Sequence, residues 1–256
     1  MYTFDSRVRF SEVDQDGYLR PDSIINYFQD CATFHAESMG LGVSHQREHH
    51  MAWLLSAWQI HIDRLPRFTE RITTATWCHS MDRLQSIRDF TITDDAGQVC
   101  VRANSLWFVF DTNRRLPMRV PESELAFVSD EKPIDLPRIR RKIAVSGDFR
   151  EVSRTVAGPE HIDANHHVNN ARYVLMALDA ATAASGSYPQ VEDRIHNLES
   201  IRVQYKQMAL LGDTIVACVQ EDDGQVIIDL RDPEGGSYAV VALSGRDEGN
   251  RKEDIR

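Results

Sequence analysis

The chain carries the same pattern twice, and this internal repeat constrains its fold more than any other feature of the sequence. Residues 14–19 read DQDGYL, and residues 163–168, which lie 149 positions further on, read DANHHV. Later in each half, alternating apolar residues precede TERI at 69–72 and GDTI at 212–215, now 143 positions apart. Chance could supply either match alone. Two matches in the same order indicate a tandem duplication, in which one structural unit is used twice.

Both halves predict the same order of secondary structure. A short strand (3–10 and 144–153) leads to the polar loop and then to a helix, which Pro21 can open and Gly40 can close in the first half. The second helix, at 170–184, is apolar on nearly every face and is expected to be deeply buried. Strands then follow at 53–64, 71–80, 84–93 and 98–111, and again at 198–207, 214–221, 226–231 and 237–246. One helix followed by an antiparallel meander, twice, predicts an α+β fold in which each helix lies on its sheet.

The segment between the halves differs from both in composition. Residues 121–142 contain Pro133, Pro137 and a run of cationic side chains, which is typical of an extended, solvated linker. We therefore expect an N-terminal half at 1–120, a linker at 121–142 and a C-terminal half at 143–246. Residues 247–256 are charged and nearly devoid of large apolar side chains, which predicts a flexible tail.

Charge and cysteine usage restrict the class of protein. Lys and Arg number 29 against 39 Asp and Glu, giving a net charge of −10, which argues against broad binding to nucleic acid or to an anionic membrane. The opening residues have no apolar run of signal-peptide length, and no later segment is expected to span a bilayer. The four cysteines are far apart and form no C-x-x-C pair. They predict reduced, packed thiols in a cytoplasmic protein.

One segment in the second half predicts chemistry. Asp163, Asn165 and His167 stand on alternate positions, and alternate residues of an extended segment point the same way. Asn169 and Asn170 follow and can cap the next helix, with its unbonded N–H groups facing the same spot. A carboxylate, an amide and an imidazole before a helix N-terminus predict a site that polarises and hydrolyses a carbonyl group. The alternative interpretation is a polar turn that leads into a core helix.

Several segments, taken in order, resemble the acyl-acyl carrier protein (acyl-ACP) thioesterases. The resemblance extends over about residues 2–219 and is carried by NYFQD at 26–30, HAESMGLG at 35–42, HIDRLP at 61–66, NSLW at 104–107, NRRL at 113–116 and residues 163–173. It implies a tandem, or double, hotdog fold, in which each half is a long helix wrapped by a curved antiparallel sheet. It also implies hydrolysis of acyl-ACP to a free fatty acid and carrier protein in fatty acid biosynthesis. No cofactor and no metal is implied.

The resemblance assigns roles within the 163–170 segment. His167 is expected to act as base or proton shuttle, because an imidazole titrates near neutrality. Asn165 would hold a water or the substrate carbonyl. Asp163 would orient these two groups or attack the carbonyl itself. Backbone N–H groups around residues 168–171 would stabilise the oxyanion, with Asn169 and Asn170 contacting the substrate.

The sequence departs from the family pattern at one catalytic position. The resemblance implies a glutamate beside a cysteine on the strand that follows the helix, but Met208 and Ala209 stand there. Methionine can neither polarise water nor orient an imidazole. Three alternatives remain: Asp163 takes over the acid–base role, Gln207 or Gln204 positions the water, or the enzyme is slow.

By resemblance, the first half is expected to hold the acyl chain. The candidate lining residues are Phe28, Phe34, Met39, Trp53, Trp58 and Trp107, although ordinary core packing is the stronger interpretation of each one individually. The counterpart loop at 14–19 has no imidazole, so we expect no second active site there.

The basic linker residues suggest a docking surface. Carrier proteins are strongly acidic, so Arg138, Arg140 and Arg141 could dock one on this acidic chain, or could simply keep the linker soluble. A homodimer is compatible with the sequence. His45 and His49 would share a helix face, but without an H-E-x-x-H order a solvated loop is favoured over a metal site. The alternative functions are an acyl-coenzyme A thioesterase of the hotdog class and a non-catalytic module that binds acyl thioesters.

Overall fold

The computed structural model describes residues 1–145, 147–186, 197–222 and 224–246. The predicted flexible tail at 247–256 lies outside the described residues. The chain divides into two compact units, Met1–Arg141 and Lys142–Arg256. No helix among the described residues has both the length and the apolar character needed to cross a membrane.

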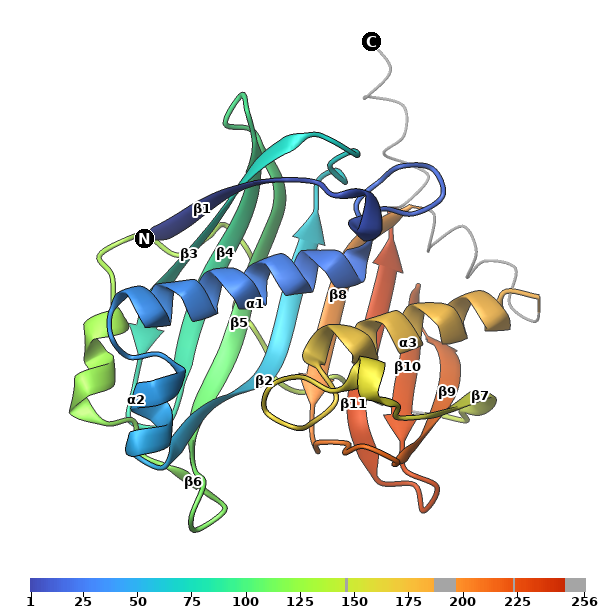
Figure 1. The fold of residues 1–256 in the computed structure, drawn as a ribbon. Coiled ribbons are helices and arrows are strands. Elements are labelled where there is room, and N and C mark those ends of the chain that lie inside the picture. The colour runs from blue at the N-terminus through green and yellow to red at the C-terminus, as the bar shows by residue number, and fades with distance from the viewer. Residues whose placement is uncertain (146, 187–196, 223, 247–256) are drawn as a thin grey trace. The chain divides into compact units, whose positions relative to one another are not determined.

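The first unit is an antiparallel sheet with the long helix α1 (Pro21–Ser38) lying on it (Figure 1). Its strand order is β1-β3-β4-β5-β2, and the short β6 also pairs with β5. The helix begins with Pro21 at its first position, as predicted, because proline has no N–H to leave unbonded there. The other elements are β1 (Tyr2–Arg7), η1 (Phe10–Glu12), α2 (Val43–Glu48), β2 (Met51–Ile62), β3 (Arg71–Met81), β4 (Ser86–Asp94), β5 (Val99–Asp111), β6 (Leu116–Met118) and η2 (Glu122–Phe127).

The second unit repeats this topology. Its strand order is β7-β9-β10-β11-β8, which matches the order of the first unit strand for strand, and every neighbouring pair is antiparallel. The elements are β7 (Arg150–Val156), η3 (Pro159–His161), α3 (Asn170–Ala184), β8 (Leu198–Tyr205), β9 (Thr214–Asp222), β10 (Gln225–Arg231) and β11 (Ser237–Gly245). The predicted duplication and the α+β double hotdog fold are both confirmed.

The repeat extends to single hydrogen bonds. The Leu19 N–H donates to the Pro66 carbonyl at 2.8 Å, and the Val168 N–H donates to the Ala209 carbonyl at 2.9 Å. These donors are 149 positions apart and the acceptors 143 apart, which are the two spacings found in the sequence. Other matched pairs are Val8 to Glu70 with Ala157 to Asp213, and Arg20 to Glu12 with Asn169 to His161.

The two helices bury different kinds of side chain. Under α1, the rings of Phe28, Trp58 and Phe90 contact one another with centroids 5.0 to 5.6 Å apart. At the position equivalent to Phe28, α3 has Ala177, and its buried face also includes Ala180, Ala181 and Ala184. Bulky aromatic residues fill the core under α1, whereas much of the buried face of α3 is made of alanines.

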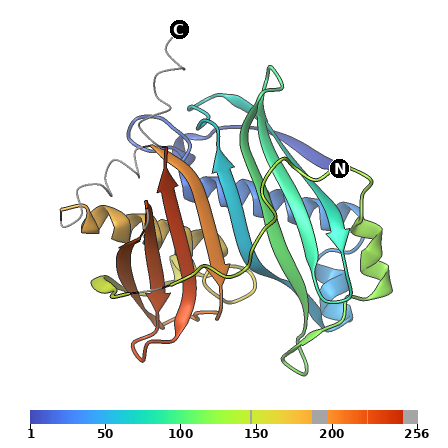
Figure 2. The ribbon, with the colours of Figure 1, turned by 180° about the vertical axis from the view of Figure 1, so that it is seen from behind.

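The connector between the halves is mostly exposed, but part of it also packs on the first unit. It crosses the face of the first unit's sheet opposite α1 (Figure 2), where Ile139 packs on Ala57 and Leu106. The Trp77 indole donates to the Lys132 carbonyl at 3.0 Å, which also binds the connector to the sheet. Apolar residues at intervals in a proline-rich segment can cover a sheet face, and composition alone did not reveal this.

Two local expectations were wrong. The strand expected at 144–153 is β7, which runs from Arg150 to Val156. Ile143, just before the expected strand, packs with Ile227 and Val240 in a core cluster. The segment with His45 forms the short helix α2 rather than a loop. The four cysteines are free and buried, as the prediction of packed thiols requires.

Candidate active site

The segment that carries Asp163, Asn165 and His167 is a tight turn rather than an extended strand. The Asp163 N–H donates to the His167 carbonyl at 2.9 Å, and the His166 N–H donates to the Asp163 carbonyl at 3.0 Å. Asp163 and His167 therefore stand at the base of the turn, both half-buried, and Asn165 is exposed near its tip. The argument from alternating positions was wrong, although the turn still gathers the three residues in one small loop of the second unit.

Asp163 has a structural role that the sequence did not show. Its carboxylate accepts a hydrogen bond from the Asn165 N–H at 2.8 Å, as side chains at the start of a turn often do. In the first unit, Asp14 accepts from the Asp16 N–H at 2.9 Å in the same way. Because the copy without an imidazole keeps this bond, Asp163 is better explained as the residue that shapes the turn than as a nucleophile.

The start of α3 offers fewer oxyanion donors than predicted. Asn169 caps the helix, and its side chain accepts from the Ala171 N–H at 2.8 Å. The Val168 N–H is bonded to Ala209 and the Asn169 N–H to His161. The fold therefore already uses the N–H groups of Val168, Asn169 and Ala171. A developing oxyanion would depend on side-chain donors such as the exposed amide of Asn165.

The segment Lys206–Leu210 adjoins this loop and contains the departure from the family pattern. Met208 is 45% exposed, and its neighbour Ala209 is fully buried and bonded to Val168. Gln207 is exposed on the same segment, whereas the side-chain oxygen Oε1 of Gln204 accepts from the Ile143 N–H at 3.1 Å. Of the two glutamines, only Gln207 is placed beside the loop by the described contacts.

Sequence reasoning missed two tyrosines that fasten this region. The Tyr173 hydroxyl accepts from the Ala209 N–H at 2.9 Å, and the Tyr205 hydroxyl donates to the Asn170 carbonyl at 3.0 Å. Burial raises the pKa of Tyr173 to about 12 and that of Tyr205 well above its usual value, so both hydroxyls stay neutral. Only the three-dimensional neighbours of these residues distinguish them from ordinary core aromatics.

The first unit's loop is closed by contacts that the second lacks. There, the Phe68 N–H donates to the Gly17 carbonyl at 2.8 Å, and the Arg67 guanidinium lies over the Tyr18 ring at 4.6 Å and bonds its hydroxyl. In the second unit, Leu211 and His166 stand at the positions of Phe68 and Gly17. Leu210 and His167 stand at the positions of Arg67 and Tyr18. Within the described residues, neither equivalent contact is formed.

Of the candidate acyl-lining residues, Trp107 lines a pocket found among the described residues. Phe28 and Trp58 are fully buried in the aromatic core described above, and the Trp53 indole donates to the buried Glu124 carboxylate at 2.8 Å. The pocket beside Trp107 has a volume of about 270 Å³ and is mostly apolar. The other residues around it are Ser56, Leu84, Gln85, Leu106, Phe108, Pro117, Met118 and Arg141. For Phe28 and Trp58, core packing is the better-supported interpretation.

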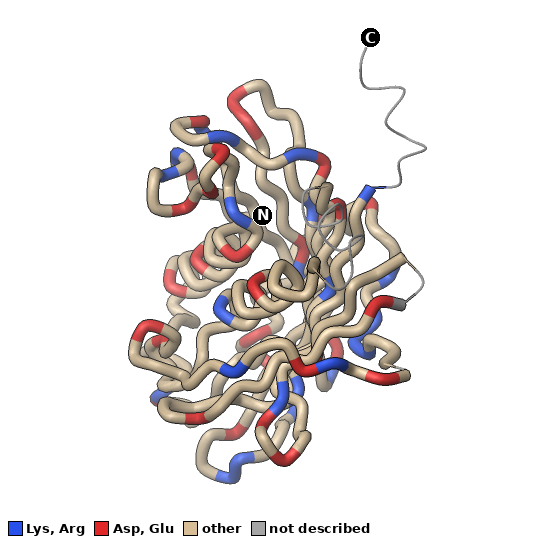
Figure 3. Tube along the Cα trace, turned by 90° about the vertical axis from the view of Figure 1, so that its right-hand side faces the viewer, with Lys and Arg blue, Asp and Glu red and all other residues tan. Residues whose placement is uncertain are grey.

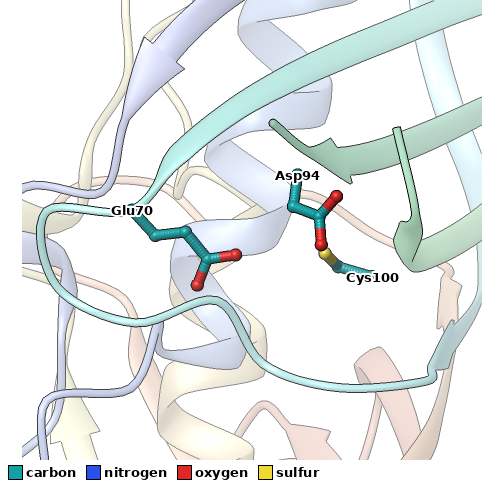
Figure 4. Close-up of side chains that lie close together, drawn as sticks. All are labelled: Glu70, Asp94 and Cys100. Atoms are coloured by element: carbon teal, nitrogen blue, oxygen red, sulfur yellow. The ribbon is translucent and has the colours of Figure 1, made fainter. Parts of the chain in front are cut away.

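A cluster of possible metal ligands in the first unit is explained by an arginine. Glu70, Asp94 and Cys100 place one ligand atom each within 4.8 Å of one another (Figure 4). The Arg64 guanidinium contacts both carboxylates at 2.6 Å and lowers the pKa of Glu70 by hydrogen bonding and charge, against the opposing effect of burial. The positive charge that these carboxylates require is therefore already supplied by the protein.

Comparison with known proteins agrees with this geometry. A family model described as the acyl-ACP thioesterase N-terminal domain matches residues 1–127. A solved structure of an acyl-ACP thioesterase from Bacteroides thetaiotaomicron is 25% identical, covers 95% of this chain and 97% of its own, and superposes with a TM-score of 0.82. This chain belongs to the acyl-ACP thioesterase family.

Relatives from plants extend the comparison. An oleoyl-acyl carrier protein thioesterase of Coriandrum sativum, described as chloroplastic, is 26% identical over 94% of this chain and 68% of its own length. A second from Arabidopsis thaliana is 26% identical over 81% of this chain and 60% of its own. The chain therefore spans about two thirds of these acyl-ACP thioesterases. A 12:0-ACP thioesterase from Umbellularia californica, 17% identical, covers 96% of each chain with a TM-score of 0.80 and shares the fold.

Proposed function

We propose that this protein hydrolyses acyl-ACP thioesters and releases a free fatty acid and the carrier protein. The observation that carries the proposal is the loop of the second unit, where His167 takes the position of Tyr18, a residue that closes the same loop in the first unit, and Asn165 takes the position of Asp16. Membership of the acyl-ACP thioesterase family supports the choice of substrate.

His167 serves as the base in this mechanism. It removes a proton from a water as that water attacks the thioester carbonyl carbon, and the proton then passes to the departing thiolate. The exposed Asn165 amide donates to the carbonyl oxygen as negative charge develops on it. Asp163 holds the turn in shape through its bond to the Asn165 N–H.

Gln207 is our candidate for orienting the attacking water. It is the exposed polar side chain next to Met208, the position at which the family resemblance implies a glutamate. An amide can hold a water but cannot take its proton, so His167 is left as the only base in this scheme. A lower rate than that of a glutamate-containing relative is the expected consequence.

We further propose that the connector cations dock the carrier protein. Arg138, Arg140 and Arg141 are exposed on a chain of net charge −10. Basic and acidic residues are interspersed over the rest of the trace in the view of Figure 3, so attraction to an acidic partner depends on such local groups. The double charge reversal Arg138→Glu/Arg141→Glu should raise KM for a carrier-bound substrate and leave a small thioester unaffected. An unchanged KM for the carrier-bound substrate would rule out this surface.

The remaining expectations stay predictions. A cytoplasmic location is proposed from the sequence, whereas the plant relatives above are described as chloroplastic. The homodimer and the acyl chain held by the first unit are likewise proposals that await measurement.

Steady-state hydrolysis of matched substrates tests the function. We expect acyl-ACP to be hydrolysed with a higher kcat/KM than the coenzyme A ester of the same acyl group. A preference for coenzyme A would favour the alternative thioesterase. Acyl binding without turnover of either ester would favour the binding module, which the loss of the family glutamate at Met208 makes a specific alternative.

A further inference from the structure

The segment Lys206–Leu210 is held to the candidate loop and to α3 through Ala209. Its other bonds run elsewhere: the Lys206 and Gln207 N–H groups donate to the Tyr238 carbonyl at 2.8 and 3.2 Å, and the Leu210 N–H donates to the Asp213 carboxylate at 2.8 Å. Ala209 is fully buried, its carbonyl accepts from the Val168 N–H at 2.9 Å, and its own N–H donates to the Tyr173 hydroxyl at 2.9 Å. The first bond joins the segment to the end of the candidate catalytic loop. The second joins it to the first turn of α3.

Comparison with the first unit indicates a role for the Tyr173 hydroxyl. At the positions equivalent to Ala209 and Tyr173 it has Pro66 and Ile24, which are both buried. Pro66 keeps the carbonyl bond to Leu19, at 2.8 Å, but proline has no N–H that needs an acceptor. A hydroxyl is therefore present in the copy that has a buried N–H and absent in the copy that has none. This pattern is not expected if Tyr173 were only a bulky core residue.

Tyr173 is also well placed to hold its position. It is 2% exposed, and its ring meets that of Tyr205 edge-on with centroids 5.9 Å apart. Tyr205 in turn bonds the Asn170 carbonyl in the first turn of α3. A buried N–H left without an acceptor is costly, so loss of the Tyr173 hydroxyl should make Ala209 shift toward water.

We propose that Tyr173 is a positioning residue for thioester hydrolysis. Its hydroxyl holds Ala209 at one end of the segment while the Tyr238 carbonyl holds Gln207 at the other, and together they keep Gln207 and Met208 in register with the loop that carries Asn165 and His167. The inference rests on the proposed function. It adds a residue that touches neither substrate nor water and acts through the backbone of the segment beside the loop.

The variant Tyr173→Phe removes the hydroxyl and keeps the ring. We expect kcat for acyl-ACP to fall at least 10-fold with KM changed less than 3-fold, because substrate binding does not involve this hydroxyl. Amide hydrogen exchange at Ala209 should accelerate at least 10-fold in the same variant. A matched control is Tyr27→Phe in the first unit, which removes a hydroxyl bonded to Glu12 at 2.6 Å and should leave kcat unchanged.

A second variant separates positioning from simple destabilisation. Tyr173→Phe/Ala209→Pro recreates the pairing of an apolar side chain with proline that the first unit uses, so no N–H is left unsatisfied. We expect it to recover most of the kcat lost in Tyr173→Phe. Failure of this rescue, or an unchanged kcat in Tyr173→Phe, would overturn the proposal.

The two hypotheses fail in different ways. Wild-type protein that hydrolyses no thioester would refute the proposed function, and exchange at Ala209 would still report whether Tyr173 holds the segment. Active wild-type protein in which Tyr173→Phe leaves Ala209 exchange unchanged would refute the positioning role alone.

Discussion

The loops at residues 14–19 and 163–168 have the same backbone frame but differ in what covers it. Both turns are shaped by an aspartate, Asp14 or Asp163, and both precede a long helix. In the first unit, Arg67 and the Phe68 N–H close the loop over Tyr18 and Gly17. In the second, leucines take the positions of Arg67 and Phe68, and the described residues form neither contact.

This difference suggests how one copy of a duplicated scaffold acquires chemistry. The hydrogen bonds that define the loop are present in both copies, so the backbone geometry of the loop is the same in each. The change is the loss of two closing contacts and the arrival of an imidazole and an amide. Leu210 and Leu211, which are 51% and 61% exposed, leave an apolar edge beside the loop that suits a lipid substrate.

Substitution at matched loop positions gives the largest expected contrast. His167→Ala should lower kcat/KM at least 100-fold, since general base catalysis typically contributes about 10²–10⁴-fold. Asn165→Ala should also abolish most turnover, through loss of the oxyanion donor. In the first unit, Tyr18→Ala and Asp16→Ala should leave turnover within about 2-fold of wild type, because neither residue is expected to act as an acid or base in the reaction. Wild-type rates in His167→Ala, with the fold checked by circular dichroism, would refute the assignment.

The aromatic core of the first unit provides the next contrast. Phe28→Ala should lower the free energy of unfolding by about 3–5 kcal/mol, as other buried Phe→Ala changes do. Replacing its counterpart, Ala177→Phe, should cost about 1–3 kcal/mol through overpacking. Denaturant titration measures both. A shift in acyl chain-length preference with less than about 1 kcal/mol of destabilisation in Phe28→Ala would instead identify an acyl-lining residue.

A pH-dependent difference is expected from His35 near the C-terminal end of α1, where the second unit has Ala184. Burial and the neighbouring Arg88 guanidinium, which donates to the His35 Nδ1, lower the pKa of His35 to about 4. As pH falls, His35 takes up a proton in the unfolded chain before it does so in the folded protein. The contribution of neutral His35 to the free energy of unfolding is therefore complete above about pH 6.5 and is lost as pH falls toward 4. We expect a loss on the order of 1 kcal/mol for this half-exposed group. Unfolding of wild type and His35→Gln at pH 7 and pH 4.5 measures it, and an equal loss in both would exclude His35 as the cause.

The tips of the two loops differ by a backbone strain that should be small and measurable. Gly17 has φ +82° and His166 has φ +64°, a conformation that disfavours side chains. His166→Gly should raise the free energy of unfolding by up to about 1 kcal/mol, and Gly17→Ala should lower it by about as much. Open space around Gly17 means that no clash confuses the comparison. If His166→Gly also reduced turnover, His166 would have to be added to the catalytic residues.

Much of the fold could be predicted because its signals are local. Helix α3 was expected at 170–184 and is found at Asn170–Ala184. Its signal is local, because a capping asparagine followed directly by an apolar stretch marks where the helix begins. The family and double hotdog predictions are confirmed by the comparisons. The sequence did not reveal that Ile139 and Ile143 pack against strands far away in the sequence, and it placed the start of β7 too early.

The sequence proposed residues for the candidate site but misjudged their local geometry. Asp163, Asn165 and His167 stay predictions as catalytic residues, and the structure corrects how they are held. The expected alternation failed because a turn bond between His166 and Asp163 outweighs the strand pattern. The N–H groups of Val168 and Asn169, which were expected to bind the oxyanion, instead donate to carbonyl groups elsewhere in the unit.

The sequence by itself determined the duplication, the order of helices and strands and the family, because each depends on repeats, caps and periodicities that lie within short stretches of chain. Only the tertiary structure decided which loop is closed, which backbone donors are already used and why Tyr173 stands opposite Ala209. Those two residues are 36 positions apart, and their bond exists only because the sheet returns the chain to the start of α3. Contacts of that kind follow from topology, and no local pattern encodes them.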